Sequence, residues 1–118
     1  MEIETRSGGA LETACDALIV PVSGRSGIDT VGGLASELDP EVRDAIAGLV
    51  EAARFTGKPG STLSLTTLGR LPARRLVLAG IGETDGLTEE GIARGYGAAA
   101  REARGAGAHE VVAVAPPA

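Results

Sequence analysis

The sequence is poor in aromatic side chains and in the residues that most often hold metals or form disulfides. Its 118 residues include no tryptophan and one each of tyrosine, phenylalanine, histidine and cysteine. Platforms on which nucleic-acid bases could stack are therefore nearly absent. The lone Cys15 excludes an intrachain disulfide and a cysteine-based metal cluster. The hydrophobic fraction of 43% is mostly Ala, Val, Leu and Ile, so the core must be aliphatic and tightly layered.

Positive charge is also scarce. Eleven basic residues stand against 16 acidic ones, which gives a net charge of -5. Such a chain repels phosphate backbones and anionic membranes, so nucleic acid is not an expected partner. The N-terminus has no basic segment followed by an apolar core, and no apolar run approaches the length that spans a membrane. We therefore expect a cytoplasmic protein without a membrane partner.

The hydrophobic patterns predict one α/β domain over residues 1–118, a length that suits a single core. Continuous apolar runs such as 17–22 are typical of strands covered on both faces. The link over 69–74 is too short for a parallel crossover, so the strands on either side of it should be antiparallel neighbours in a mixed sheet. The expected strands cover 1–6, 17–22, 62–68, 75–80 and 110–115, and the expected helices begin at Pro40, capped by Asp39, and after Thr88.

Both helices should be amphipathic. The first should end at Gly57 and Gly60. Its expected buried face consists of Val42, Ala45, Ile46, Leu49, Val50 and Ala53. The second contains Gly91, Gly95 and Gly97, each of which weakens a helix by about 1 kcal/mol relative to alanine. That cost implies close backbone packing at these glycines. The expected buried face of the second helix consists of Ile92, Tyr96, Ala99 and Ala103.

Two glycine-rich segments are the candidate ligand-binding positions. Gly80-Ile81-Gly82 follows an apolar strand and precedes a helix, as phosphate-cradling loops do. A dinucleotide fingerprint needs a third glycine at position 85, where Asp85 instead adds negative charge. A tight exit from the strand is therefore the favoured interpretation of that segment. The other segment is Gly32-Gly33, which opens a short helical stretch after the buried strand.

No residue is predicted to be catalytic or to bind a metal. His109 has no second histidine or cysteine with which to form a metal site and should be an exposed loop residue. Cys15 has small apolar neighbours and should pack at a strand entrance. The aspartates are scattered without the spacing that would hold a cation. The serines lie in glycine-rich turns, and none forms a Gly-x-Ser-x-Gly elbow.

Two motifs resemble a known family. Phe55-Thr56-Gly57-Lys58-Pro59-Gly60, at the end of a helix, and the stretch 71–82, which reaches Gly80-Ile81-Gly82, resemble the N-terminal domain of the leucyl (cytosol) aminopeptidase family. The order and spacing of these motifs, together with the closing segment 111–116, extend the resemblance over nearly the whole chain. It implies a three-layer macro-domain-like fold with a mixed sheet flanked by helices.

In that family the chemistry lies in a second, C-terminal domain. The resemblance implies a parent enzyme that removes N-terminal residues such as leucine from peptides with two divalent metals, zinc or manganese. The family's Asn-Thr-Asp-Ala-Glu-Gly-Arg signature does not occur here, so no catalytic residue, metal or cofactor is assigned to this chain. The implied partners are its own catalytic domain and the other subunits of a homo-oligomer, a hexamer. The leading hypothesis is a non-catalytic N-terminal domain that supports assembly, stability or access to the active site.

A second hypothesis is a stand-alone binding module. The strand 17–22, followed by a glycine pair and a helix, resembles macro domains, which bind ADP-ribose on a glycine-rich loop. The asparagines expected in such domains are absent here, which favours inheritance of the fold without the ligand. This alternative places a pocket for ADP-ribose or a related nucleotide between Gly32-Gly33 and Gly80-Ile81-Gly82.

Overall fold

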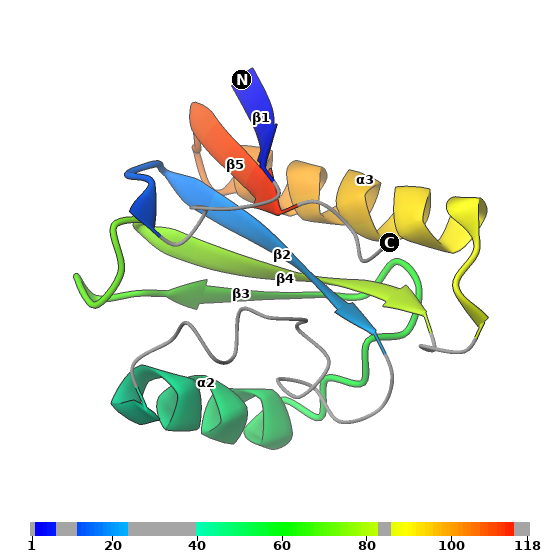
Figure 1. The fold of residues 1–118 in the computed structure, drawn as a ribbon, viewed down its shortest axis with the longest axis horizontal. Coiled ribbons are helices and arrows are strands. Elements are labelled where there is room, and N and C mark those ends of the chain that lie inside the picture. The colour runs from blue at the N-terminus through cyan, green and yellow to red at the C-terminus, as the bar shows by residue number, and fades with distance from the viewer. Residues whose placement is uncertain (1, 7–11, 24–39, 83–85, 115–118) are drawn as a thin grey trace.

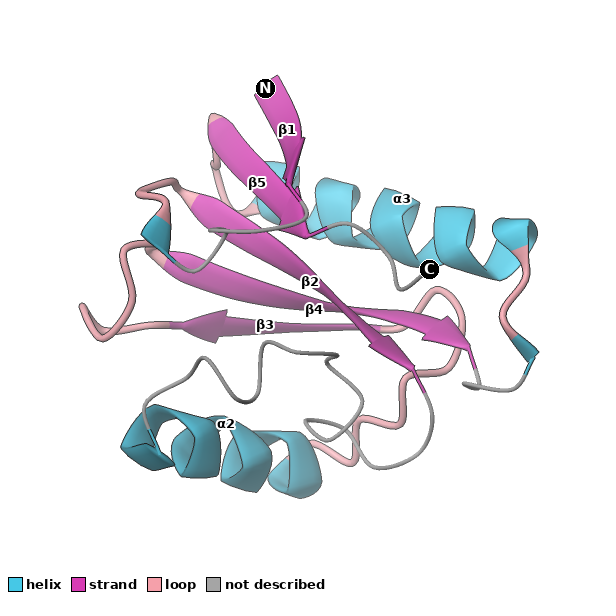
Figure 2. Cartoon of the chain, viewed as in Figure 1, coloured by secondary structure: helices cyan, strands magenta, loops and turns pink. Residues whose placement is uncertain are grey.

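The computed structural model describes residues 2–6, 12–23, 40–82 and 86–114. In them, a five-stranded mixed sheet lies between helix α2 on one face and helix α3 on the other (Figure 1, Figure 2). This arrangement confirms the predicted three-layer α/β fold. The elements in chain order are β1 (Glu2–Arg6), β2 (Ala17–Ser23), α2 (Pro40–Ala52), β3 (Thr62–Thr66), β4 (Arg75–Gly82), α3 (Glu89–Gly105) and β5 (Glu110–Val114).

The strand order in the sheet is β1-β5-β2-β4-β3. The first four strands in this order are parallel, and β3 runs antiparallel to β4 with Ser64 opposite Val77. The predicted antiparallel pair is confirmed, and β1 lies at the edge of the sheet opposite β3. Pro21 lies beyond Ile19, the last residue of β2 that pairs with described residues of β5. A residue that cannot donate to a ladder thus stands near the end of its strand.

Two strands end at residues other than those the pattern predicts. β3 stops at Thr66 rather than at 68, because Thr67 begins a tight turn in which the Arg70 N–H donates to the Thr67 carbonyl at 3.0 Å. Leu68 and Gly69 have φ angles of 54° and 81°, as in the type I′ turn, whose twist suits an antiparallel pair. β4 continues to Gly82 rather than ending at 80, because its parallel pairing with β2 extends to Ser23 opposite Gly82.

The two faces of the sheet have different cores. Side chains alternate along a strand, so Leu18 and Val20 of β2 face α2 whereas Ile19 faces α3. The α2 face is filled by large aliphatic residues from the strands and the helix. On α3, by contrast, the buried residues are Gly91, Gly95, Ala99 and Ala103. Because these residues are small, the backbone of α3 comes close to that of β4.

The buried face of each helix is narrower than predicted. On α2, Val42, Ile46 and Val50 are buried, but Leu49 is 49% exposed and Ala45 is also exposed. The reason is that α2 meets the sheet along one row of residues four apart, and the neighbouring row faces away from the core. Ile92 and Tyr96 of α3 are half-buried. The expected cap Asp39 and the expected helical stretch after Gly32-Gly33 lie outside the described residues.

The two helices end by the same hydrogen-bond pattern with different residues. After α3, Gly107 has φ of 87° and the Ala108 N–H donates to the Ala103 carbonyl, which is a Schellman motif with glycine at its usual position. After α2, Arg54 has φ of 56° and the Phe55 N–H donates to the Val50 carbonyl. The prediction that Gly57 and Gly60 end α2 is therefore wrong, because Arg54 already turns the chain before either glycine.

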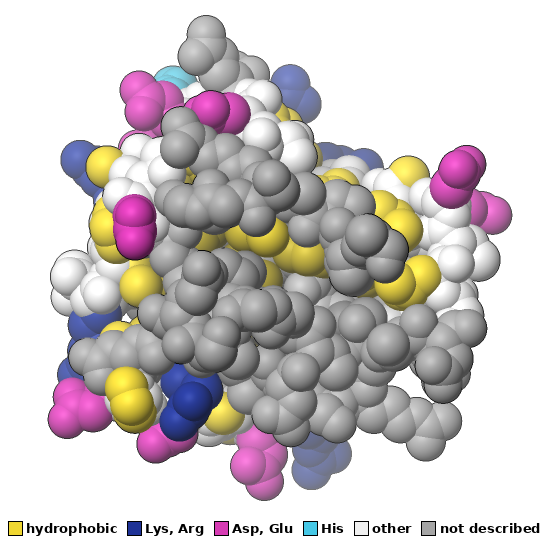
Figure 3. Space-filling view, viewed as in Figure 1, with side chains coloured by type: hydrophobic (Ala, Val, Ile, Leu, Met, Phe, Trp, Pro, Cys, Tyr) yellow, Lys and Arg dark blue, Asp and Glu magenta, His cyan; other side chains and the backbone are white. Residues whose placement is uncertain are grey.

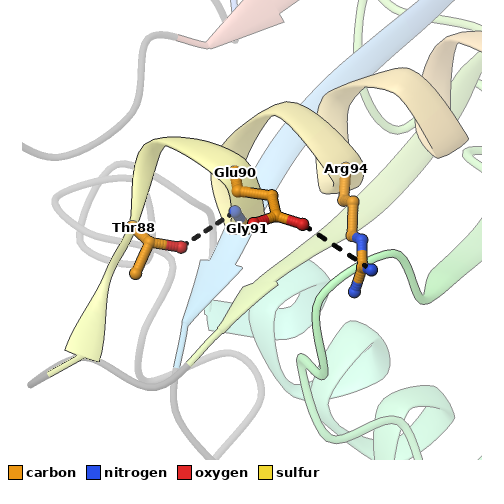
Figure 4. Close-up of polar contacts among 4 residues, drawn as sticks. All are labelled: Thr88, Glu90, Gly91 and Arg94. Atoms are coloured by element: carbon orange, nitrogen blue, oxygen red, sulfur yellow. Dashed lines mark hydrogen bonds and ion pairs between the residues drawn. The ribbon is translucent and has the colours of Figure 1, made fainter.

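The start of α3 agrees with its sequence signals (Figure 4). The Thr88 hydroxyl accepts a hydrogen bond from the Gly91 N–H at 3.0 Å, which satisfies one of the free donors of the first turn. Glu90 and Arg94 form an ion pair of 3.8 Å between exposed side chains, and such a pair adds little stability. No helix in the described part of the chain is long and apolar enough to cross a membrane.

Candidate functional site

The segments that stand out in the sequence, 55–60 and 80–82, lie next to each other at the end of β4. The Gly60 N–H donates to the Gly80 carbonyl at 3.1 Å, and the Gly80 N–H donates to the Ser61 carbonyl at 2.8 Å. The Gly82 N–H donates to the Gly57 carbonyl at 3.0 Å. The turn after α2 thus continues the sheet along the last three residues of β4.

Glycine at position 80 is explained by this packing. An added Cβ would lie 2.2 Å from the Lys58 carbonyl oxygen and 2.3 Å from the Ser61 Oγ. From the other side, a Cβ on Gly95 of α3 would lie 2.4 Å from the Gly80 carbonyl oxygen. Three stretches of backbone, from residues 57–61, β4 and α3, therefore meet at Gly80 and form what we call the glycine junction. The Gly80 N–H and C=O are both hydrogen-bonded within the domain.

Of the other candidate glycines, the structure describes Gly82 alone. Gly82 has φ of 112°, a conformation that favours glycine. Gly32 and Gly33 lie outside the described residues. Ligand binding by Gly32, Gly33, Gly80 or Gly82 therefore stays a prediction from the sequence, and the described atoms of Gly80 and Gly82 already have a structural use.

Asp16 holds the start of β5 in place, a role that no pattern in the neighbouring sequence predicts. Its Oδ2 accepts hydrogen bonds from the backbone N–H groups of His109 at 2.8 Å and Glu110 at 3.0 Å. In return, the Asp16 N–H donates to the Glu110 carbonyl at 2.9 Å. The backbone hydrogen bonds, first from Glu110 and then from His109, hold the pKa of the Asp16 carboxyl below its ordinary value.

Replacing Asp16 by asparagine should lower the urea midpoint of unfolding at pH 7, and this difference should shrink as the pH falls below 3.8. The folded-state pKa of Asp16 lies below the ordinary value of 3.8. Its charged form therefore stabilises the fold above that pH, and the contribution fades as the pH falls through the folded-state pKa. Urea titrations from pH 7 to pH 2 measure the effect. Asp44→Asn removes the same charge from an exposed position of α2, and an equal response in both variants would contradict the assignment.

The reactive side chains of the described residues serve the fold. Cys15 is 6% exposed in the α2-face core, and burial raises the pKa of its thiol, the opposite of an activated nucleophile. The predicted packing role of Cys15 and the exposed position of His109 are confirmed. The Tyr96 hydroxyl donates to the Val114 carbonyl, and burial raises the pKa of Tyr96 to about 12. Among the described residues, no group of three or more His, Cys, Asp or Glu side chains is placed to hold a metal ion.

An apolar groove lies on the surface of the described part of the chain. It has a volume of about 240 Å³ and runs between α2 and the turn that joins β3 to β4. Leu49 and Leu68 are 49% and 83% exposed, and Figure 3 shows apolar side chains at the surface beside charged ones on the side of the molecule where α2 lies. The residues that matter for its shape are Ala45, Ile46, Leu49, Leu65, Leu68 and Leu71. The groove is not evident in the sequence, because the helical periodicity predicts that both Ala45 and Leu49 lie on the buried face of the helix.

The family model described as "Cytosol aminopeptidase family, N-terminal domain" matches residues 19–118. The chain belongs to this family. The matched residues therefore include the glycine junction, both helices and the groove. The match confirms the resemblance seen in the sequence.

Relatives within the family are much longer than this chain. A "Probable cytosol aminopeptidase" from Geobacter sp. strain M21 is 38% identical over 104 residues, which are 88% of this chain and 20% of the relative. A protein of the same description from Geobacter sulfurreducens is 39% identical over 74 residues, which are 63% of this chain and 15% of the relative. The chain thus spans about a fifth or less of the length of these relatives.

A solved structure confirms the macro-like fold. The macrodomain of Mycobacterium tuberculosis DarG superimposes with a TM-score of 0.63 at 18% sequence identity, covering 95% of this chain and 74% of that one. At this identity the likeness concerns the fold alone. The N-terminal domain of the cytosol aminopeptidase family therefore has, in this chain, the architecture of a macrodomain.

Proposed function

We propose that this domain is the non-catalytic N-terminal part of a metal-dependent aminopeptidase that removes N-terminal amino acids from peptides. The domain would support the assembly or stability of that enzyme, or access to its active site. The observation that supports this most is the family match over residues 19–118, combined with relatives more than four times as long that are described as cytosol aminopeptidases.

The chemistry would belong to the part of such a protein that this chain lacks. The family resemblance implies two divalent metals, zinc or manganese, in the catalytic domain. The residues described here do not fit such a pair, because they contain no group of three metal-binding side chains, so no step of hydrolysis is assigned to them. The proposed partners are the catalytic domain and the other subunits of a homo-oligomer, a hexamer, and the proposed location is the cytoplasm.

The native size of the polypeptide tests this proposal. An antibody raised against the domain should detect, in source cells, a polypeptide more than four times as long as this chain. The purified native protein should release N-terminal amino acids from peptides, lose this activity to a chelator and regain it with zinc or manganese. The 118-residue chain should be inactive with and without metal. A native band at 11.8 kDa would contradict the proposal.

The macrodomain fold favours one alternative, a module that binds ADP-ribose or a related nucleotide. The internal hydrogen bonds of Gly80 and Gly82 leave fewer backbone donors for a diphosphate at that loop. Calorimetric titration of the 118-residue chain with ADP-ribose separates the two functions. Heat of binding that is lost on changing Gly32 or Gly33 to a bulkier residue would support the module, and no heat at millimolar ligand would exclude it.

A further inference from the structure

The groove between α2 and the β3–β4 turn has a feature that the folding of the domain does not explain. Leu68 is 83% exposed at its rim and has φ of 54°. A branched aliphatic side chain is unfavourable both in water and in this left-handed conformation, which asparagine, aspartate and glycine adopt far more readily. Strained, exposed residues of this kind gather at binding sites, where the contact offsets the cost.

The neighbouring residues indicate what chemistry would fit there. Leu49 of α2, which is 49% exposed, lines the same groove together with Leu65 and Leu71. A volume of about 240 Å³ is enough for one or two aliphatic side chains. The exposed Arg70 also lines the groove, so an acidic residue next to those aliphatic side chains would be favoured.

The small size of the groove separates the possible occupants. A stable contact between separate protein molecules usually buries about 800 Å² on each partner, and one groove with two exposed leucines cannot supply that area. A segment of the same polypeptide needs far less contact, because its tether holds it at an effective concentration in the millimolar range. About four fifths of each relative lies outside the part that this chain matches, and that part is the family's N-terminal domain.

We infer that the groove of Leu49 and Leu68 receives one or two aliphatic side chains, next to a carboxylate, from the polypeptide that follows this domain in a protein of its relatives' length. The inference rests on the proposed function, since it needs that longer polypeptide. Leu68 then contacts the rest of the enzyme, and its strained, exposed conformation lowers the stability of the isolated domain.

Leu68→Asn tests this contact without the risk of unfolding the domain. Asparagine suits the turn better, so the folded-to-unfolded ratio of the 118-residue chain should rise about fivefold. In the native polypeptide, backbone amides of 45–50 and 65–71 should exchange hydrogen at least about tenfold more slowly than in the 118-residue chain, and Leu68→Asn should remove this protection. Ile3→Thr, at an exposed aliphatic residue on the opposite edge of the sheet, should leave it intact.

Each other outcome overturns the inference in a recognisable way. If the native polypeptide is longer but its amides exchange as fast as those of the 118-residue chain, the proposed contact does not exist. The same holds if the protection persists in Leu68→Asn. Either result leaves the proposed function unchanged. If the 118-residue chain dimerises as its concentration rises, and the Leu68→Asn variant does not, the groove binds a second copy of the chain instead. A native polypeptide of 118 residues overturns both the inference and the proposed function.

Discussion

Gly95→Ala should destabilise the domain by about 3 kcal/mol or more, a large part of the stability of a small domain. The new Cβ would lie 2.4 Å from the Gly80 carbonyl oxygen and 2.8 Å from the Ile81 Cγ2. The carbonyl belongs to a strand in the middle of the glycine junction, where Gly60 donates to the same oxygen. Neither α3 nor β4 can shift without losing the hydrogen bonds and packing at Gly80. The clash must therefore push the helix and the strand apart.

Gly97→Ala is the matched control, two residues along the same helix. A Cβ there meets nothing closer than the flexible end of Arg101 at 3.6 Å, so alanine should stabilise the domain by about 1 kcal/mol through its higher helix propensity. Urea unfolding of both variants measures the two effects. If both substitutions shift the midpoint in the same direction, α3 does not pack on Gly80 as described.

Phe55→Ala should cost about 3 to 5 kcal/mol, the usual range for a buried phenylalanine. Phe55 is the only phenylalanine of the chain, is 9% exposed and belongs to the core between α2 and the sheet. Its N–H also closes the Schellman motif on the Val50 carbonyl. In that motif the side chain after the turn packs on the last turn of the helix, so its loss leaves both a cavity and a loose helix end.

Phe55→Leu separates the two parts of this effect. Leucine keeps an apolar side chain at the helix end and leaves a smaller cavity, so the loss should be less than half that of alanine. Thermal and urea unfolding give the two values. Equal losses would show that the aromatic ring itself, and not the volume filled, decides the stability at this position.

The sequence predicted the elements of this fold well because their signals are local. The continuous apolar run of β2, the cap Thr88 and the glycine that ends α3 are each signals contained within a few neighbouring residues. The antiparallel pair followed from the short link over 69–74. The same local reasoning was wrong at the end of α2, where Arg54 adopts a conformation that glycine usually takes, and the surrounding contacts, not propensity, hold it there.

The three glycines of α3 illustrate the limit of sequence reasoning. The sequence implied close packing at Gly91, Gly95 and Gly97 alike. The structure confirms it at Gly95 and at Gly91, where a Cβ would lie 3.0 Å from the Ile81 carbonyl oxygen, but not at Gly97. The direction in which a helical residue points relative to a distant strand depends on how the helix is placed, and no local pattern contains that placement.

The sequence alone thus determined the α/β class, the order of the elements, the two apolar faces of the sheet and the family, because each follows from periodicity or from motif order along the chain. Only the tertiary structure decided that Gly80 meets Lys58 and Gly95, that Asp16 holds the start of β5, and that Leu49 and Leu68 border an open groove. These features join residues that are up to 94 positions apart. Their contacts exist only once the sheet has brought its strands together.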